Sequence, residues 1–285
     1  MASQCHQPRE LFAPRQPPSP WTQQPSARRR APAAAAAEAS PPRTPLEAAS
    51  QARSALRRWR DAAAGAAGPA QRRLRVDLPL PRPGAGVGDP IEADDESDWP
   101  GGCEQRHRAV RPLVEAFLDG YRPEFVGMLE SPADGIGAWR VAGGPSASPA
   151  SPGGGPGPIT VVSGVTNATF QPFARLCAGE YGEAVLRPDH LLVCLNCVWS
   201  SSKDIGQFWE RGLRSQAAAL IDSAEEWEVL YRFETDLRTA AGATGVAFRS
   251  WPGPFCLYLT PKDEGDSFGG ELTMAAGCIW FCIPP

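Results

Sequence analysis

The apolar residues of the first folded segment recur at the spacing of a helix. One face carries Ala49, Ala52, Leu56, Trp59 and Ala63. Arginines occupy the opposite face, which predicts an amphipathic helix from residue 44 to about residue 65. Its start is marked by the capping box Thr44-Pro45-Leu46-Glu47. In such a box the threonine hydroxyl accepts a hydrogen bond from a first-turn amide, and the glutamate reaches back toward the cap.

Further apolar patterns predict alternating helices and strands. Leu74, Val76, Leu78 and Leu80 alternate with charged residues, which predicts a strand. A helix is predicted over residues 106–119, where Pro112 marks a kink or a new first turn. The clearest helix is predicted over residues 203–220, with an apolar face made by Ile205, Phe208, Trp209, Leu213, Ala217 and Leu220. Strands are predicted over residues 159–163, 191–198, 228–234, 246–251, 255–260 and 278–283.

The order of these elements defines the expected fold class. Residues 191–198 are apolar almost throughout, which is typical of a central parallel strand buried on both faces. The alternation of strands and helices implies a right-handed, largely parallel core. We therefore predict an α/β protein with a single three-layer domain over residues 44–285, whose central sheet is largely parallel and whose C-terminal portion is antiparallel. Low-complexity loops are expected at residues 81–98 and 143–158.

Charge divides the chain into two parts. Residues 1–80 carry 13 arginines against 5 acidic residues, whereas residues 81–285 carry 15 basic against 27 acidic residues. Residues 1–43 are rich in Pro, Ala, Ser and Arg and lack the apolar run of a secretory signal, which predicts a disordered, transit-peptide-like segment. The alternative is a nucleic-acid-binding arm, with arginines on phosphates and Trp21 or Trp59 stacked on bases. The composition favours targeting. No stretch is apolar for long enough to span a bilayer.

Motifs that would carry chemistry are sparse. The glycines at positions 84, 86 and 88 have the spacing of a dinucleotide-binding turn, but the prolines and acidic residues around them predict a plain loop. Cys194 and Cys197 have thiol-redox spacing. Because residues three apart in a strand point to opposite faces, we expect their sulfurs to diverge and the thiols to be buried and reduced, unless the chain bends there. His107 and His190 lie in no recognisable triad or metal motif, so no catalytic residue, metal or cofactor is predicted.

Two strand ends carry small polar residues, at the usual position of ligand sites in α/β sheets. Because the carboxyl ends of neighbouring parallel strands share one edge of a sheet, we expect both loops to lie together there. The candidate ligand-binding residues are Ser163, Thr166, Asn167, Asn196, Trp199 and Asp204. The structural alternative for residues 163–169 is a capped helix start, which the residue types favour.

Aromatic residues are the other candidate functional feature of the C-terminal half. Tryptophans occur at positions 199, 209, 227, 251 and 280. Their regular placement within the predicted elements indicates core residues. An exposed subset would instead form a docking surface.

Five short motifs resemble those of a chloroplast family whose shared domain is of unknown function. They are Asp98-Trp99-Pro100-Gly101-Gly102 with Gln105 and Arg106, residues 134–137, residues 196–200, residues 204–209 and residues 231–235. The family includes the low photosystem II accumulation assembly proteins of plants and the C-terminal domain of a chloroplast adenylate kinase. The resemblance spans roughly residues 46–283 and implies a domain without a known active site.

The resemblance and the transit-like head together predict a chloroplast protein of the stroma, soluble or peripheral at the thylakoid. It would be a non-catalytic binding or assembly factor with photosystem-related protein partners and no nucleic-acid partner. The alternative location is the mitochondrion. The alternative function is a nucleotide- or sugar-phosphate-binding protein, or an enzyme, using the loops near residues 163–169 and 196–202. An enzyme requires titratable groups that converge on these loops, where the sequence offers Lys203 and Asp204, whereas an assembly factor requires an exposed aromatic or apolar patch.

Overall fold

A computed structural model describes most of the chain after residue 39. The described residues are 40–64, 72–91, 102–130, 135–141, 157–187, 189–199, 201–207, 209–222, 227–238, 244–259 and 273–274. All of them belong to one unit, Ala36–Pro285. Nearly all of the predicted transit segment lies outside the described residues, as do the predicted strand at residues 278–283 and most of the predicted loop at residues 143–158.

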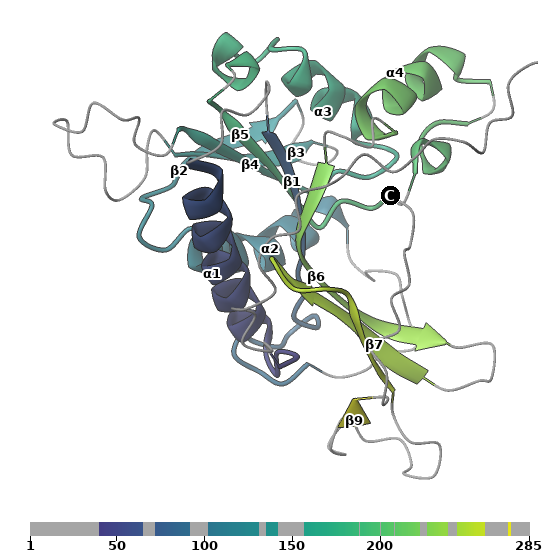
Figure 1. Ribbon diagram of the computed structural model, residues 1–285. Coiled ribbons are helices and arrows are strands. Elements are labelled where there is room, and N and C mark those ends of the chain that lie inside the picture. Colours follow the sequence, from purple (N-terminus) through teal and green to yellow (C-terminus); the bar gives the residue numbers. More distant parts are fainter. Residues whose placement is uncertain are drawn as a thin grey trace, which may run out of the picture. The chain divides into compact units, whose positions relative to one another are not determined.

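The described part of the chain contains helices and strands in alternation (Figure 1). The helices are α1 (Pro45–Ala64), α2 (Cys103–Phe117), α3 (Phe170–Cys177) and α4 (Arg211–Ile221), with short 3-10 turns at Glu183–Leu186 and Ser202–Asp204. The strands are β1 (Arg72–Asp77), β2 (Glu124–Leu129), β3 (Ile136–Val141), β4 (Ile159–Ser163), β5 (Leu191–Leu195), β6 (Trp227–Arg238), β7 (Thr244–Ser250), β8 (Cys256–Leu259) and β9 (Thr273–Met274).

The strands form one mixed sheet in the order β2-β3-β4-β5-β1-β6-β7-β8-β9. The four central strands, from β4 to β6 in this order, are parallel, and β7, β8 and β9 continue the sheet antiparallel. These features confirm the predicted α/β class, with a mainly parallel centre and an antiparallel C-terminal portion. The antiparallel pair β2 and β3 at the other end was not predicted. A register shift between Phe125 and Gly127 interrupts the alternation that would have revealed β2.

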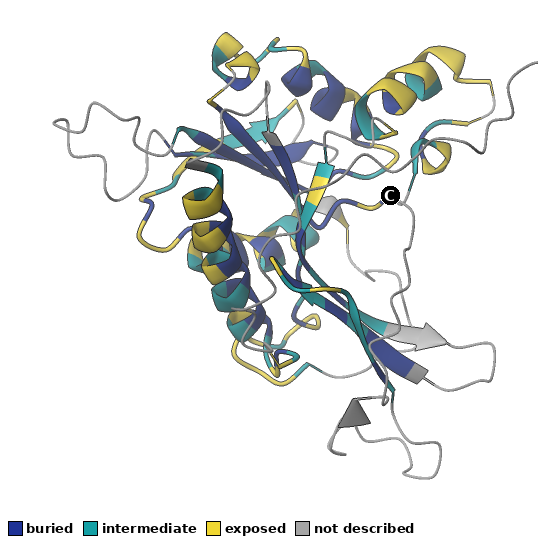
Figure 2. Cartoon of the chain, viewed as in Figure 1, coloured by how far each residue is buried: buried dark blue, intermediate teal, exposed yellow. Residues whose placement is uncertain are grey.

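Each face of the parallel strands contributes to its own apolar cluster. Strand β5 shows this most clearly, because Leu191, Val193 and Leu195 pack with α1 and α2, whereas Leu192 and Cys194 pack with α3 and α4. All five residues of β5 are buried, as predicted for a strand covered on both sides. Figure 2 shows the buried residues along these strands and on the inward sides of the helices.

The predicted start of α1 is confirmed by its cap. The amide of Glu47 donates to Thr44 Oγ1 at 3.1 Å. The Glu47 carboxylate reaches back to the amide of Arg43 at 2.7 Å, one residue earlier than the standard capping box. The segment at residues 81–91 packs beside this cap without regular structure, since the amide of Leu46 donates to the Val87 carbonyl at 2.9 Å.

The predicted helix over residues 203–220 is wrong at its start. Helix α4 begins only at Arg211. The chain before it forms the 3-10 turn at Ser202–Asp204 and then passes through Gly206, whose φ of 76° is incompatible with a continuing right-handed helix. Helix α2 also differs from its prediction, since it runs from Cys103 to Phe117 with Pro112 inside it.

Helix α2 approaches β3 closely at one glycine. The His107 ring stacks on Trp139, with the two ring centroids 5.4 Å apart. A Cβ atom placed on Gly137 would lie 2.6 Å from His107 Nδ1 and 3.1 Å from Ser163 Oγ. The absence of a side chain at Gly137 therefore makes room for the imidazole. Burial lowers the pKa of His107, and the nearby charge of Arg111 lowers it further.

We expect Gly137→Ala to destabilise the fold by about 1–2 kcal/mol, because the added methyl group displaces the stacked His107 ring. Denaturant unfolding should show a smaller penalty for the same substitution in a His107→Ala background. Gly212→Ala is the matched control, since a Cβ atom there meets nothing within 4 Å. An equal penalty in both backgrounds would contradict this account of the α2–β3 contact.

Candidate functional site at the carboxyl ends of β4 and β5

The two predicted ligand loops lie side by side at one edge of the sheet. Strands β4 and β5 are parallel neighbours and end at Ser163 and Leu195, which pair with each other. Beyond the strands, the amide of Val198 donates to the carbonyl of Val165 at 2.9 Å. The amide of Gly206 donates to Asn167 Oδ1 at 2.7 Å. These contacts confirm that the segments after β4 and β5 share one edge.

The polar side chains of the first loop bond within the loop itself. Thr169 Oγ1 donates to the carbonyl of Gly164 at 2.6 Å and accepts from the amide of Thr166 at 2.8 Å. Thr166 Oγ1 in turn accepts from the amide of Thr169 at 3.3 Å. Ser163 is buried at the end of β4, on the face of the sheet toward His107. This loop is therefore a closed turn that leads into α3.

Asn196 extends the pairing of β1 and β5 beyond the end of β5. Its Oδ1 accepts from the amide of Leu78 at 2.6 Å, and its Nδ2 donates to the carbonyl of Leu78 at 2.9 Å. Its own amide donates to Val76 at 2.8 Å. The residue is buried and has a φ of 52°, a left-handed conformation that asparagine tolerates better than most residues. The Asn196 carboxamide, a predicted ligand-binding group, thus forms the two hydrogen bonds with Leu78 that the backbone of a further β5 residue would form.

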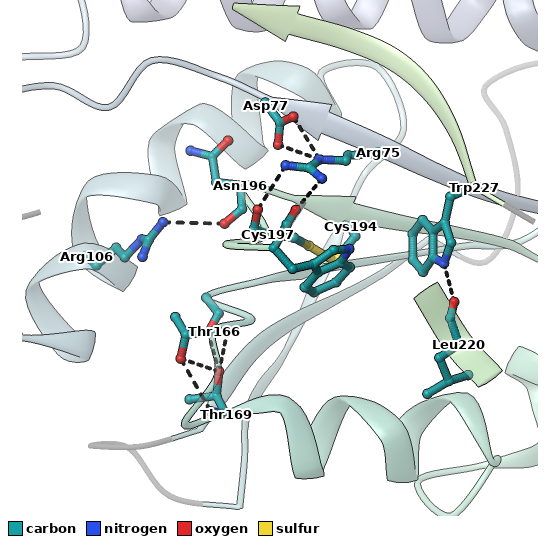
Figure 3. The surroundings of a disulfide bond; sticks show 12 residues. Arg75, Asp77, Arg106, Thr166, Thr169, Cys194, Asn196, Cys197, Leu220 and Trp227 are labelled. Atoms are coloured by element: carbon teal, nitrogen blue, oxygen red, sulfur yellow. Dashed lines mark hydrogen bonds and ion pairs between the residues drawn. A yellow bond between two sulfur atoms is a disulfide. The ribbon is translucent and has the colours of Figure 1, made fainter. Parts of the chain in front are cut away.

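Cys194 and Cys197 form a disulfide, which corrects the prediction of diverging sulfurs and reduced thiols (Figure 3). The prediction took residues 191–198 as one strand, but β5 ends at Leu195. The left-handed turn at Asn196 supplies the bend that a strand lacks, and it brings the two Cα atoms to 6.1 Å. Both cysteines are buried, at 0% and 3% exposure.

Two arginines hold the backbone of the segment at residues 196–199. Arg75 donates from Nη1 to the carbonyl of Trp199 at 2.6 Å and from Nη2 to the carbonyl of Cys197 at 3.2 Å. Arg106 donates to the carbonyl of Asn196 at 3.4 Å. Figure 3 shows both guanidinium groups directed at these carbonyls from different elements, β1 and α2. The segment is therefore fixed by side chains from both sides.

An ion pair orients the Arg75 guanidinium. Its Nε atom lies 2.8 Å from Asp77 Oδ2, and both side chains are mostly buried. Burial raises the pKa of Asp77, whereas the positive charges of Arg75 and Arg232 act in the opposite direction. Because a charged pair out of water needs further hydrogen bonds, the carbonyls of residues 197 and 199 stabilise the pair by accepting from Nη2 and Nη1 of Arg75.

Two further predicted site residues are structural. Trp199 is only 6% exposed, and its ring packs 5.4 Å from Phe173 and 6.0 Å from Trp227 between centroids. Asp204 Oδ2 accepts from the amide of Ser201 at 2.9 Å and completes a capping box on the 3-10 turn.

A hollow of about 750 Å³ opens on the outer side of the same edge, between the starts of α3 and α4. Its lining is mainly polar and comprises Asn167, Ala168, Gln171, Gln207, Trp209, Glu210, Arg211, Gly212 and Leu213. Trp209 is 64% exposed, more than any other large apolar side chain in the described part of the chain. We call this feature the α3–α4 hollow. Asn167 is the one predicted site residue that lines it.

The other lining residues were not predicted, for an identifiable reason. The apolar pattern over residues 203–220 predicts a helix with Trp209 on its apolar face, whereas α4 starts after this residue. The pair Gly206-Gln207 is the signal that could have shown the break, since glycine commonly ends a helical pattern. With the helix shortened, Trp209 precedes its first turn and is exposed.

Among the residues that the structure describes, no group of three or more His, Cys, Asp or Glu could hold a metal ion. No helix in the described ranges has the length and apolar character needed to cross a membrane.

Comparisons with protein-family models, curated proteins and solved structures find no match to this chain. The resemblance to the plastid family rests on the short sequence motifs alone.

Removal of the disulfide is expected to lower the free energy of unfolding by about 2 kcal/mol, as estimated for a four-residue closed loop. The comparison is between the native chain and a Cys194→Ala, Cys197→Ala double variant in urea. Cys256→Ser is the control, because Cys256 carries a thiol outside this edge. Equal stability of the double variant and the native chain would show that the noncovalent contacts alone fix the segment.

Asn196→Ala is expected to destabilise the chain by about 3 kcal/mol, because it leaves both backbone groups of Leu78 without partners and places alanine in a left-handed conformation. Asn196→Gly should cost about 1 kcal/mol less, since glycine adopts this φ without strain. Asn167→Ala, which loses one exposed contact, is the control and should cost under about 1 kcal/mol. Equal losses for the alanine and glycine variants would remove the backbone argument.

Proposed function

We propose that this chain is a non-catalytic binding or assembly factor that uses the carboxyl edge of its sheet as a binding surface. The observation that carries the proposal is the division of this edge into two parts. The polar groups inside it bond to one another, as Asn196 does with Leu78. An exposed indole, Trp209, lies outside it.

The internal bonding makes the edge a preformed surface. The segment at residues 196–199 is held by a disulfide and two arginines, and the loop after β4 is closed by its threonines. A surface that is already ordered loses little conformational entropy when it binds. Val198, at 51% exposure, adds a second apolar side chain to the outer side of this edge. Both features suit recognition of a partner.

The cellular setting of this proposal comes from the sequence. The transit-like head and the family resemblance support a chloroplast protein of the stroma or thylakoid surface, with photosystem-related protein partners. A mitochondrial location is the alternative.

We also infer that the domain is organised in three layers. The support is the alternation along β5, which assigns neighbouring residues to clusters with α1 and α2 on one side and with α3 and α4 on the other. Strands buried on both faces are typical of this arrangement.

A second candidate function is the binding of a small molecule, such as a nucleotide or a sugar phosphate, with or without catalysis. The α3–α4 hollow favours a small-molecule ligand, since its volume lies in the range of small-molecule sites. Its position outside the carboxyl ends of parallel strands is the usual position of ligands in α/β folds.

The assembly function predicts that the full chain retains photosystem II core subunits from detergent-solubilised thylakoids. Trp209→Ala should reduce this retention about tenfold, because exposed tryptophans are frequent energetic centres of interfaces. Leu186→Ala is the matched control, since Leu186 is 49% exposed but precedes β5 at the other end of that strand. Immunoblots of the retained subunits provide the measurement. Retention that is absent, or equal in all three proteins, would contradict the proposal.

A further inference from the structure

We infer that the α3–α4 hollow binds the ring of an uncharged sugar, as part of an oligosaccharide. The inference rests on the proposed use of the carboxyl edge as a binding surface and specifies the ligand class of that site. It depends on three properties of the lining: an exposed indole, carboxamides beside it, and balanced charge. Each property selects a different feature of the ligand.

The indole of Trp209 selects a ligand with a flat, weakly polar face. An exposed tryptophan keeps a large apolar area in water, and Trp209 is 64% exposed. The C–H groups on one face of a pyranose ring form such a surface. Ring packing on the indole would remove apolar area from water on both partners.

The carboxamides select a ligand with hydroxyl groups. Asn167, Gln171 and Gln207 line the hollow beside Trp209. A carboxamide both donates and accepts hydrogen bonds, and a hydroxyl does the same, so the two groups pair in either sense. Asn167 Oδ1 accepts from the amide of Gly206, which fixes the orientation of this carboxamide. A sugar ring offers hydroxyls around its edge while its face remains free for the indole.

The charges of the lining disfavour a phosphate. Glu210 and Arg211 are the two ionised residues that line the hollow, and they are opposite in sign. Glu210 Oε2 accepts from the amide of Gln207 at 2.6 Å, which holds the carboxylate at the rim. A phosphate site presents an excess of cationic donors, whereas this lining is neutral in sum. The hollow therefore suits an uncharged sugar better than a sugar phosphate or a nucleotide.

Gly212 provides a way to block the hollow without removing a contact. It lines the hollow in the first turn of α4, and a Cβ atom there would meet nothing within 4 Å. A leucine at this position would extend into open space at the hollow. Because leucine and alanine both exceed glycine in helix propensity, either substitution should stabilise α4.

The experiment is calorimetric titration of the full chain with maltohexaose and with cellohexaose, using glucose 6-phosphate and AMP as charged comparison ligands. We expect saturable binding of at least one neutral hexasaccharide. Trp209→Ala and Gly212→Leu should each weaken it about tenfold or more, and Gly212→Ala should leave it unchanged. Thermal unfolding confirms that each variant is folded, and both Gly212 variants should unfold at or above the native midpoint.

The outcomes separate this inference from the proposed function. If neither hexasaccharide binds but glucose 6-phosphate or AMP binds in a Trp209-dependent manner, the sugar inference is overturned and the small-molecule function stands. If no titrated ligand binds while Trp209→Ala reduces retention of photosystem subunits, the hollow contacts protein and the sugar inference is again overturned. If Trp209→Ala alters neither measurement, both proposals fail. Binding that persists in Gly212→Leu would place the sugar elsewhere on the chain.

Discussion

The carboxyl edge of this protein depends on the pair of hydrogen bonds between the Asn196 carboxamide and the backbone of Leu78. They let the chain leave β5 in a left-handed turn without losing its attachment to β1. The turn brings Cys197 back to Cys194 and presents the carbonyls of residues 197 and 199 to Arg75. Each of these contacts requires the backbone direction that the turn sets.

The cost of burying polar groups explains why so many bonds gather here. Arg75 and Asp77 lie within the sheet, where a charged group is stable only when it has an oppositely charged partner and further hydrogen bonds. The carbonyls of the segment at residues 196–199 supply the acceptors, so the segment and the ion pair stabilise each other. Asn196, a ligand-site candidate in the sequence, thereby forms its side-chain hydrogen bonds within the interior. An asparagine, a threonine pair and an aspartate at strand ends do not by themselves indicate a ligand.

Features set by local patterns could be predicted from the sequence, whereas features set by one unusual dihedral angle could not. The cap at Thr44, the doubly buried β5 and the shared edge of the two loops follow from residue spacing. The disulfide depends on the left-handed conformation of Asn196, which many asparagines do not adopt. The start of α4 depends in the same way on the positive φ of Gly206. Strand β2 could not be predicted from alternating apolar and polar residues, because its register with β3 shifts.

The misplaced start of α4 matters most for function, since it determines whether Trp209 is core or surface. A tryptophan on the apolar face of a long helix would be buried, as Trp199 is at 6% exposure. With the helix beginning at Arg211, Trp209 stands before its first turn, beside Gln207 and across from Asn167 at the α3–α4 hollow. The backbone on both sides of Trp209 is held by hydrogen bonds, from Gly206 to Asn167 and from Gln207 to Glu210, which limits the backbone entropy that binding would cost. The hydrogen bonds of Asn196 and Asp204 are made within the chain, so the proposed recognition falls to the exposed indole a few residues away.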